Sequence, residues 1–186
     1  MIKLNLGCGQ NKLEGYVNVD KFDSFAPEIV WDLEKFPWPF EDNAADEIVM
    51  NHSLEHMGER TEVFLNIIKE LYRVAADGAR ILIGVPHPRS DHFIGDPTHV
   101  RIVTPSVLSL FSKKQNREWK KTGSPNSPLA FYLDVDFDIV KVNLGLHPRW
   151  EKKLQSGEIT RDELYVAIDT HNNVVDNIEI ILTVCK

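Results

Sequence analysis

Four places in the chain carry small or polar residues directly after a short apolar run, and their types fit the recognition of an adenosine-containing ligand. These places are Gly7-Cys8-Gly9, Asp20, Asp32-Leu33 and Asn51-His52. Glycines allow the backbone to turn tightly and to bring N–H groups close to a ligand. A carboxylate at Asp20 can accept hydrogen bonds from both ribose hydroxyls. A second carboxylate at Asp32, with a neighbouring backbone N–H, suits an adenine amino group and a ring nitrogen.

The spacing of the glycines discriminates between two cofactors that contain adenosine. A dinucleotide needs its pyrophosphate on a helix N-terminus behind the pattern G-x-G-x-x-G. Lys12 stands where the third glycine should allow a helix to pack closely on the strand. S-adenosylmethionine has no phosphate and needs only the turn and the two acids. The residues therefore favour S-adenosylmethionine, and a nicotinamide-dependent oxidoreductase is the weaker alternative.

Residues 87–99 are the most unusual stretch, with three histidines and two aspartates. One interpretation is a substrate-binding loop in which His99 acts as general base or orients an acceptor hydroxyl, because a neutral imidazole can take up a proton near pH 7. His52 is a second candidate base, and His56 is either a base or a structural residue.

Two other interpretations of residues 87–99 stay open. Histidine and carboxylate are metal ligands, so His87, His92 and His99 are candidates for a metal-dependent hydrolase. The spacing matches no pair of ligands on a helix, however, and we assign no metal ligand. The alternative is a loop held by hydrogen bonds between its side chains.

The elements that position these residues follow from hydrophobic patterning. Apolar residues at helical spacing predict an amphipathic helix from about 60 to 76, with Asp77-Gly78 as its stop. Thr104-Pro105 predicts the start of a second helix that runs to 111. Short β-rich or apolar runs predict strands at 2–6, 16–20, 29–33, 46–51 and 80–86. Because carboxyl ends of parallel strands meet at one edge of a sheet, the four places described above should lie together.

Two long late strands are predicted at 131–146 and 177–184. Strands that alternate with helices and end in two such strands indicate an α/β fold, with a mostly parallel sheet closed by an antiparallel pair. Asp134, Asp136 and Asp138 alternate along the first of these strands and should therefore point to one face. That face is either a metal site or a side exposed to solvent.

The motifs and their order resemble those of class I S-adenosylmethionine-dependent methyltransferases. Residues 6–9 and 15–20 resemble the first two motifs of this family, and 31–38 resembles the third. Residues 45–49 with Leu54-Glu55-His56 resemble the fourth-strand signature of its small-molecule, type 11-like branch. The resemblance covers about residues 3–88, and Asp-Pro-Thr-His-x-Arg segments like that at 96–101 occur in the same branch.

The resemblance implies a three-layer Rossmann-like sandwich around a seven-stranded sheet whose last strand is antiparallel. It implies one domain, 1–186, that transfers a methyl group to oxygen or nitrogen of a small-molecule acceptor, such as a sugar or other metabolite, and releases S-adenosylhomocysteine. Acceptor-site loops would lie at about 87–130 and 146–176. The implied cofactor contacts are Gly7, Cys8, Gly9 and Asn51 on the methionine side, Asp20 at the ribose, and Asp32 with Leu33 at the adenine.

Two departures from the family pattern bear on the cofactor site. Asn5 stands where many members carry an acid, so no charge is offered there to the cofactor ammonium group. Residues 10–19 are all that separates Gly9 from Asp20, which predicts a very short helix or none between the first two strands. The site should be more open than usual, and a non-catalytic S-adenosylmethionine-binding module remains an alternative.

Composition limits the partners. The 186 residues are 42% hydrophobic and 26% charged, which suits one soluble domain. The net charge of −7 argues against duplex nucleic acid and anionic membranes as partners. No apolar run is long enough for a membrane span, and Met1–Leu6 leaves no room for a signal peptide. Two distant cysteines, Cys8 and Cys185, fit a reducing cytoplasm. Little of the chain is left to cover the site, so a second copy, forming a homodimer, is a candidate partner.

Overall fold

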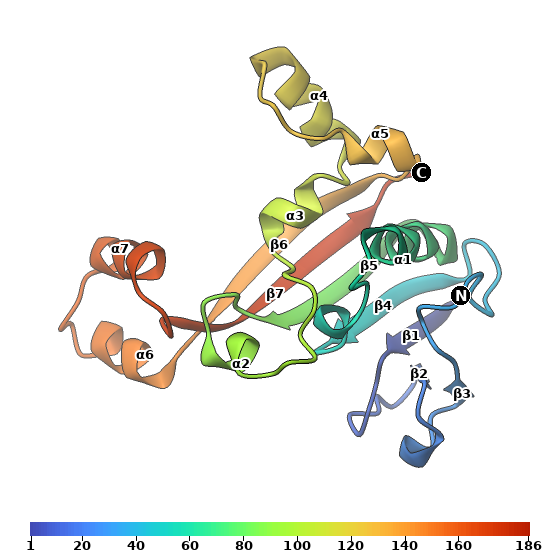
Figure 1. The fold of residues 1–186 in the computed structure, drawn as a ribbon, viewed down its shortest axis with the longest axis horizontal. Coiled ribbons are helices and arrows are strands. Elements are labelled where there is room, and N and C mark those ends of the chain that lie inside the picture. The colour runs from blue at the N-terminus through green and yellow to red at the C-terminus, as the bar shows by residue number, and fades with distance from the viewer.

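The computed structural model describes residues 1–186 and contains a seven-stranded sheet with the order β3-β2-β1-β4-β5-β7-β6 (Figure 1). The strands are β1 (Ile2–Leu6), β2 (Val17–Asp20), β3 (Ile29–Val30), β4 (Ala45–Asn51), β5 (Ala75–Pro86), β6 (Phe137–Leu146) and β7 (Val175–Val184). Strands β1 to β5 are parallel, whereas β7 is antiparallel to both β5 and β6. The predicted α/β fold, with a mostly parallel seven-stranded sheet and an antiparallel last strand, is confirmed.

The core lies on one face of this sheet. Leu4, Ile48, Ile81 and Leu182 lie side by side across β1, β4, β5 and β7, and all four are buried. They belong to a cluster of 28 buried hydrophobic residues that includes Leu71 and its neighbours on the first helix. Alternation along each strand therefore directs the apolar side chains to a single side.

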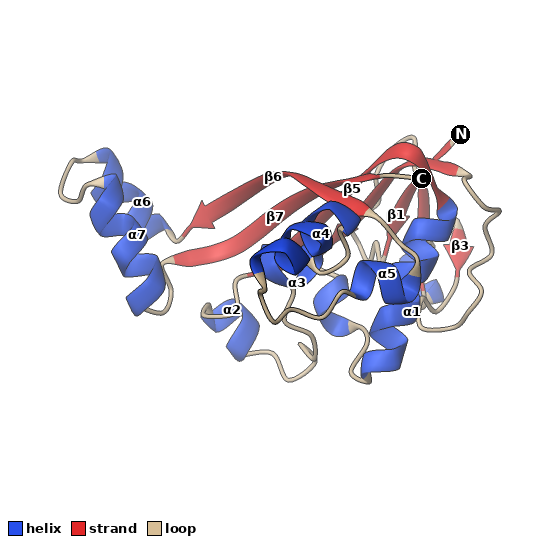
Figure 2. Ribbon diagram, turned by 90° about the horizontal axis from the view of Figure 1, so that it is seen from above, coloured by secondary structure: helices blue, strands red, loops and turns tan.

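The α-helices are α1 (Thr61–Val74), α2 (Asp91–Ile94), α3 (Pro105–Ser109), α4 (Lys113–Thr122), α5 (Leu129–Leu133), α6 (Pro148–Gln155) and α7 (Arg161–Thr170), with 3-10 helices η1 (Asp23–Phe25) and η2 (Leu54–His56). Helices α1 to α5 lie on the same side of the sheet as the core, and no α-helix covers the opposite face (Figure 2). The uncovered face carries Lys3 and Glu47, whose charged groups lie 3.6 Å apart, and exposed Arg80. The fold therefore differs in one respect from the three-layer sandwich that the resemblance implies, because one of the two layers of helices is missing.

The layer of helices is missing on this face because the connections between β1 and β4 are short and contain no α-helix. Residues 7–16, between β1 and β2, form turns and contain no helix, as their length predicts. The connection from β2 to β3 contains only η1, and the connection from β3 to β4 contains none. The predicted helices after β4 and at Thr104 are both present. The Thr104 side chain accepts a hydrogen bond from the Val107 N–H at the start of α3.

The interpretation of 131–146 as one strand is wrong at its beginning. Residues Leu129–Leu133 form α5, and β6 starts only at Phe137. Asp134 ends α5 in the left-handed conformation with φ 51°, and its carboxylate lies 2.7 Å from Lys113 Nζ. Asp136 accepts from the Lys113 N–H, and Asp138 accepts from Ser112 Oγ. The three aspartates therefore hold the start of α4 and do not form one face of a strand.

An arm made of α6 and α7 projects beyond the end of the β6–β7 hairpin (Figures 1 and 2). It has its own small cluster of buried residues, Leu164, Ala167 and Val174. Thr160 and Glu163 form a reciprocal capping box at the start of α7. None of the helices in the chain has the length and apolar character that would be needed to span a bilayer.

Candidate functional site

A pocket of about 390 Å³ opens at the carboxyl ends of β1, β2, β3 and β4. The predicted site residues in its wall are Gly7, Gly9, Asp20, Asp32, Leu33 and His52. The other wall residues are Lys21, Phe22, Phe25, Trp31, Glu34, Ser53, His56, Met57 and Thr98. Three further predicted residues, Cys8, Asn51 and His99, lie outside the wall. The strand ends thus meet at one site, as the sequence predicts.

The turn after β1 forms one side of this pocket. Gly7 and Gly9 have positive φ values of 70° and 50°. A Cβ atom on Gly7 would lie 2.5 Å from the Cβ of Ser53, so only glycine fits there. The N–H groups of Gly7 and Cys8 both donate to the Val19 carbonyl, at 2.8 and 3.0 Å. These N–H groups are therefore occupied, and the turn presents a surface without side chains rather than free donors.

Cys8 is buried behind this turn. Burial, and next the charge of Asp20, raise the pKa of its thiol. A thiol with a raised pKa forms little of the nucleophilic thiolate, so Cys8 acts as a packed residue.

Asp20 is held in a fixed orientation at the end of β2. One carboxylate oxygen accepts from the Gly9 N–H at 2.8 Å, and the other accepts from the Phe22 N–H at 2.9 Å. Its side chain is largely buried, yet it lines the pocket. Each carboxylate oxygen has a further lone pair, so Asp20 can still accept hydrogen bonds from a ligand hydroxyl.

Asn5 anchors the loop that takes the place of a helix after β1. Its Nδ2 donates to Asn18 Oδ1 at 2.7 Å and to the Asn11 carbonyl at 2.9 Å. Asn18 Oδ1 also accepts from the Leu13 N–H. Asn5 and Asn18 are both buried, and neither lines the pocket. An amide is needed at position 5 because the group must donate to two acceptors, which a carboxylate cannot do.

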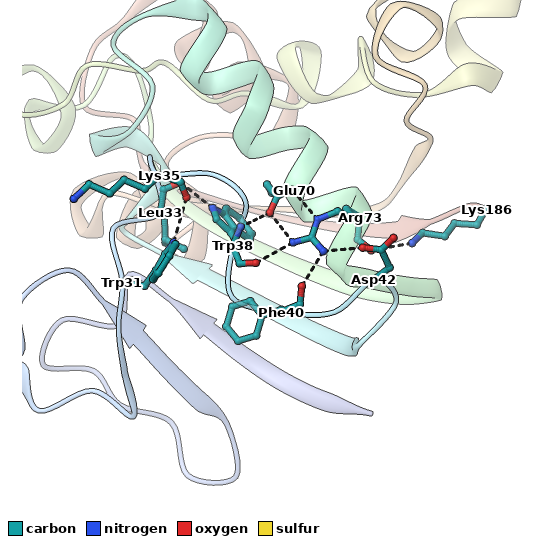
Figure 3. A network of polar contacts seen from close by, with 9 residues as sticks. All are labelled: Trp31, Leu33, Lys35, Trp38, Phe40, Asp42, Glu70, Arg73 and Lys186. Atoms are coloured by element: carbon teal, nitrogen blue, oxygen red, sulfur yellow. Dashed lines mark hydrogen bonds and ion pairs between the residues drawn. The ribbon is translucent and has the colours of Figure 1, made fainter.

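The loop 31–42 carries Asp32 and Leu33 into the pocket, and Trp38 fastens it to the core (Figure 3). The Trp38 indole is buried and donates to the Leu33 carbonyl at 2.9 Å. The Trp38 N–H donates to Glu70 Oε2 at 2.6 Å. The Leu33 N–H has no backbone acceptor and remains available to a ligand.

Glu70 and Arg73 on α1 complete this attachment (Figure 3). Arg73 binds both Glu70 oxygens at 2.7 Å and donates to the carbonyls of Trp38 and Phe40. Burial alone would raise the pKa of Glu70, but the Arg73 guanidinium and the Trp38 N–H outweigh it and lower this pKa. Sequence reasoning missed this ion pair, although the i,i+3 spacing of an acid and a base on a helix is a usable signal.

Aromatic side chains form much of the apolar wall. Phe22 and Phe25 pack edge to face with ring centroids 6.0 Å apart, and they follow Asp20 directly. The backbone N–H of Trp31 donates to the Asp20 carbonyl at 2.8 Å, which ties the two acid-bearing strand ends together. The two phenylalanines were not predicted; their signal is the presence of large apolar residues in an otherwise polar connection.

The fourth strand end brings histidines to the pocket. His52, with a positive φ of 51°, lies with its Nδ1 3.4 Å from Oε1 of buried Glu55. The Glu55 carboxylate raises the pKa of His52. His56 contacts Thr98 Oγ1 through Nδ1 at 2.9 Å. Thr98 belongs to the predicted acceptor loop, which packs on η2 because the N–H groups of residues 100 and 101 donate to the Glu55 carbonyl.

His99 lies behind His56, with the two ring centroids 4.6 Å apart. It stacks on Phe93, and its Nδ1 contacts the Phe93 carbonyl at 3.0 Å. The three histidines considered for a metal site, His87, His92 and His99, are not brought together. His99 is grouped instead with Glu55 and His56.

No protein-family model matches the sequence, and a search of the curated proteins found no match. Solved structures, however, share its fold. An S-adenosylmethionine-dependent methyltransferase from Archaeoglobus fulgidus has a TM-score of 0.66 and 19% identity, over 97% of this chain and 85% of that one. The [4+2]-cyclase SpnF has a TM-score of 0.55 and 16% identity, over 98% and 75%.

A third solved structure contains ligands. The 1,6-didemethyltoxoflavin-N1-methyltransferase from Burkholderia thailandensis, with 1,6-didemethyltoxoflavin and S-adenosylhomocysteine bound, has a TM-score of 0.54 and 9% identity, over 100% of this chain and 71% of that one. At these identities the likeness establishes the fold, which is the Rossmann-like fold of class I S-adenosylmethionine-dependent methyltransferases.

Proposed function

We propose that this chain, which has the fold of these methyltransferases, binds S-adenosylmethionine and transfers its methyl group to oxygen or nitrogen of a small-molecule acceptor. The observation that carries the proposal is the fixed Asp20 carboxylate in a pocket shared with Asp32 and Leu33. The fold alone would not suffice, because one fold serves many activities, and the cyclase above has the same one.

The pocket fits this cofactor better than it fits a dinucleotide. Three carboxylates, Asp20, Asp32 and Glu34, lie in its wall with Lys21 as the only lysine. No helix begins after Gly9, so no helix N-terminus is available to a pyrophosphate. Negative charge opposes phosphate groups but favours a sulfonium cation. The volume of about 390 Å³ lies within the usual range for small-molecule sites.

The adenosine part of the cofactor has partners of suitable chemistry. Asp20 would accept hydrogen bonds from the ribose hydroxyls, and Asp32 with the free Leu33 N–H would meet the adenine edge. The side-chain-free turn at Gly7 and Gly9 would lie along the methionine part. When bound, S-adenosylmethionine supplies an electrophilic methyl group on a sulfonium centre, and S-adenosylhomocysteine remains after transfer.

The acceptor would bind on the β4 side of Gly7, because β1 lies between β2 and β4 in the sheet. His52, His56 and Thr98 supply the polar groups there. Of the two predicted bases, His52 is the better placed, since it lines the pocket and Glu55 orients its Nδ1 side. His52 would take the proton of an acceptor hydroxyl through its other ring nitrogen. His99 would not contact the acceptor but would pack against the His56 ring on this side of the pocket.

Calorimetric titration with S-adenosylmethionine and S-adenosylhomocysteine tests the proposal. The variant Asp20→Ala should weaken binding roughly 10- to 150-fold, the equivalent of about 1.5–3 kcal/mol for hydrogen bonds to a charged group. Asp134→Asn, an exposed acid outside the pocket, is the matched control and should bind like the wild type.

The possible outcomes separate the alternatives. Binding that depends on Asp20, followed by release of S-adenosylhomocysteine with a hydroxyl or amine acceptor, supports the enzyme. Binding with no turnover across an acceptor screen supports the non-catalytic module. Absence of binding to both ligands in the folded wild type overturns the proposal.

A further inference from the structure

Glu55 is a buried carboxylate without a hydrogen-bonding partner. Glu55 is 1% exposed, and neither its Oε1 nor its Oε2 accepts a hydrogen bond. The His52 Nδ1 is 3.4 Å from Oε1, which is longer than a well-formed hydrogen bond. A buried charge is costly unless a partner compensates it. Oε2 has no such partner within the protein.

Two histidines lie next to this carboxylate. Glu55, His56 and His99 each offer one ligand atom within 4.8 Å of the others. His56 and Thr98 are in the wall of the pocket, whereas Glu55 and His99 lie behind it. The cluster is therefore buried on one side and borders the proposed acceptor site on the other.

The hydrogen bonds around His56 fix its tautomer. Thr98 Oγ1 donates to Asp96 Oδ1 at 2.6 Å. The same hydroxyl oxygen must then accept from His56 Nδ1, which lies 2.9 Å away. A neutral His56 thus carries its proton on Nδ1, and its Nε2 has a free lone pair.

His99 has the same arrangement. The Phe93 carbonyl can only accept, so His99 Nδ1, at 3.0 Å, is the donor. The nearest carboxylate oxygen to His99 Nε2, Oδ2 of Asp96, is 3.7 Å away and too distant for a hydrogen bond. Histidines that bind metals commonly donate their second ring N–H to a carbonyl or similar acceptor, which orients the ring and fixes the tautomer.

We propose that Glu55, His56 and His99 form a site for a divalent cation of the zinc class. Two imidazoles and one carboxylate are a ligand set of catalytic zinc, and three protein ligands leave one coordination position open. Magnesium and calcium prefer sites made only of oxygen ligands. If the proposed methyl transfer holds, the open position would take an oxygen atom of the acceptor; the metal site itself does not depend on that function.

Zinc titration of the full chain, stripped with a chelator and dialysed, tests the site. We expect one zinc ion per chain by calorimetry and a visible ligand-field spectrum with cobalt. Glu55→Gln and His99→Ala should abolish both signals. His92→Ala, which changes an exposed histidine outside the cluster, should leave both unchanged.

A variant outside the ligand set keeps the test independent of folding. Thr98→Val removes the hydroxyl that accepts from His56 and donates to Asp96, leaves all three ligands in place, and should weaken zinc binding roughly 10- to 100-fold. Equal affinity in the wild type and in Glu55→Gln, or the absence of saturable binding, would overturn the site. Asp20→Ala should bind zinc normally. Zinc binding without S-adenosylmethionine binding would therefore refute only the proposed function, and the reverse would refute only the metal site.

Discussion

The attachment of loop 31–42 to α1 predicts that Glu70→Gln strongly destabilises the chain. Glu70 accepts three hydrogen bonds, from the Trp38 N–H and two Arg73 nitrogens, at 2.6–2.7 Å. A glutamine has the same shape but turns an N–H₂ group toward these donors, so at least one charge-assisted bond is lost and the half-buried Arg73 guanidinium loses the charge of its partner on α1.

The expected cost is about 2–4 kcal/mol. Removing one partner of a buried ion pair costs roughly 3–5 kcal/mol. We expect a smaller cost for Glu70→Gln because the Arg73 side chain is 27% exposed and keeps its contact with Asp42. For a chain of 186 residues, about 2–4 kcal/mol lowers Tm by roughly 4–16 °C.

Urea unfolding followed by tryptophan fluorescence measures this change in the free energy of unfolding. An unchanged m-value shows that the folded and unfolded states keep their compactness. Glu62→Gln on the same helix is the matched control. Its side chain is 68% exposed, and its loss should cost less than about 0.5 kcal/mol. The same small effect for Glu70→Gln would refute the reasoning, because the loop would then be held by apolar packing alone.

Three further changes test other parts of the site. Gly7→Ala should destabilise the fold and abolish cofactor binding, because the new Cβ would collide with Ser53. Gly9→Ala should still fold, because nothing lies within 4 Å of its new Cβ, and thermal denaturation compares the two variants. Asn5→Asp, which introduces the acid that many members of the resembled family carry there, should lower stability by roughly 2–4 kcal/mol, since a carboxylate would face two acceptors; equal stability in urea would show that the loop after β1 does not need this amide. Glu28→Gln should reduce the loss of stability in acid. Hydrogen bonds from Lys12 and from residue 18 lower the pKa of Glu28 to about 2 from 4.5. The stability that Glu28 contributes is therefore complete above about pH 4.5 and is lost as the pH falls toward 2. Acid titrations followed by circular dichroism would contradict this if the wild type and the variant lost their structure at the same pH.

The parts of the site that the sequence predicts are those that depend on local pattern. Asp20 and Asp32 end short β-rich runs, and parallel strands bring such ends together whatever the surrounding loops do. The glycine turn depends on backbone conformation at Gly7 and Gly9 alone. These residues could therefore be placed in one pocket without knowledge of the packing.

The parts that the sequence does not predict depend on distant partners. Glu55 in Leu54-Glu55-His56 has the sequence context of a surface acid, yet it is buried in the fold, where the N–H groups of residues 100 and 101 donate to its carbonyl. The same two hydrogen bonds hold the loop that carries His99 against η2, and Phe93 orients the His99 ring. Asp134 resembles a strand residue by alternation, but residues 129–133 form the helix α5, in which Leu129 and Leu133 pack against the core and the Ala130 N–H donates to the Leu110 carbonyl.

The uncovered face of the sheet has a consequence for the heat of unfolding. The heat-capacity change of unfolding scales with the apolar surface that water gains, and partly wet strands gain less of it. A typical chain of 186 residues would show roughly 2.2–2.8 kcal/mol/K. With charged Lys3, Glu47 and Arg80 on a face that already meets solvent, this chain should fall below that range. Its stability would then vary little with temperature, and the fold would resist cold better than a sheet enclosed on both sides.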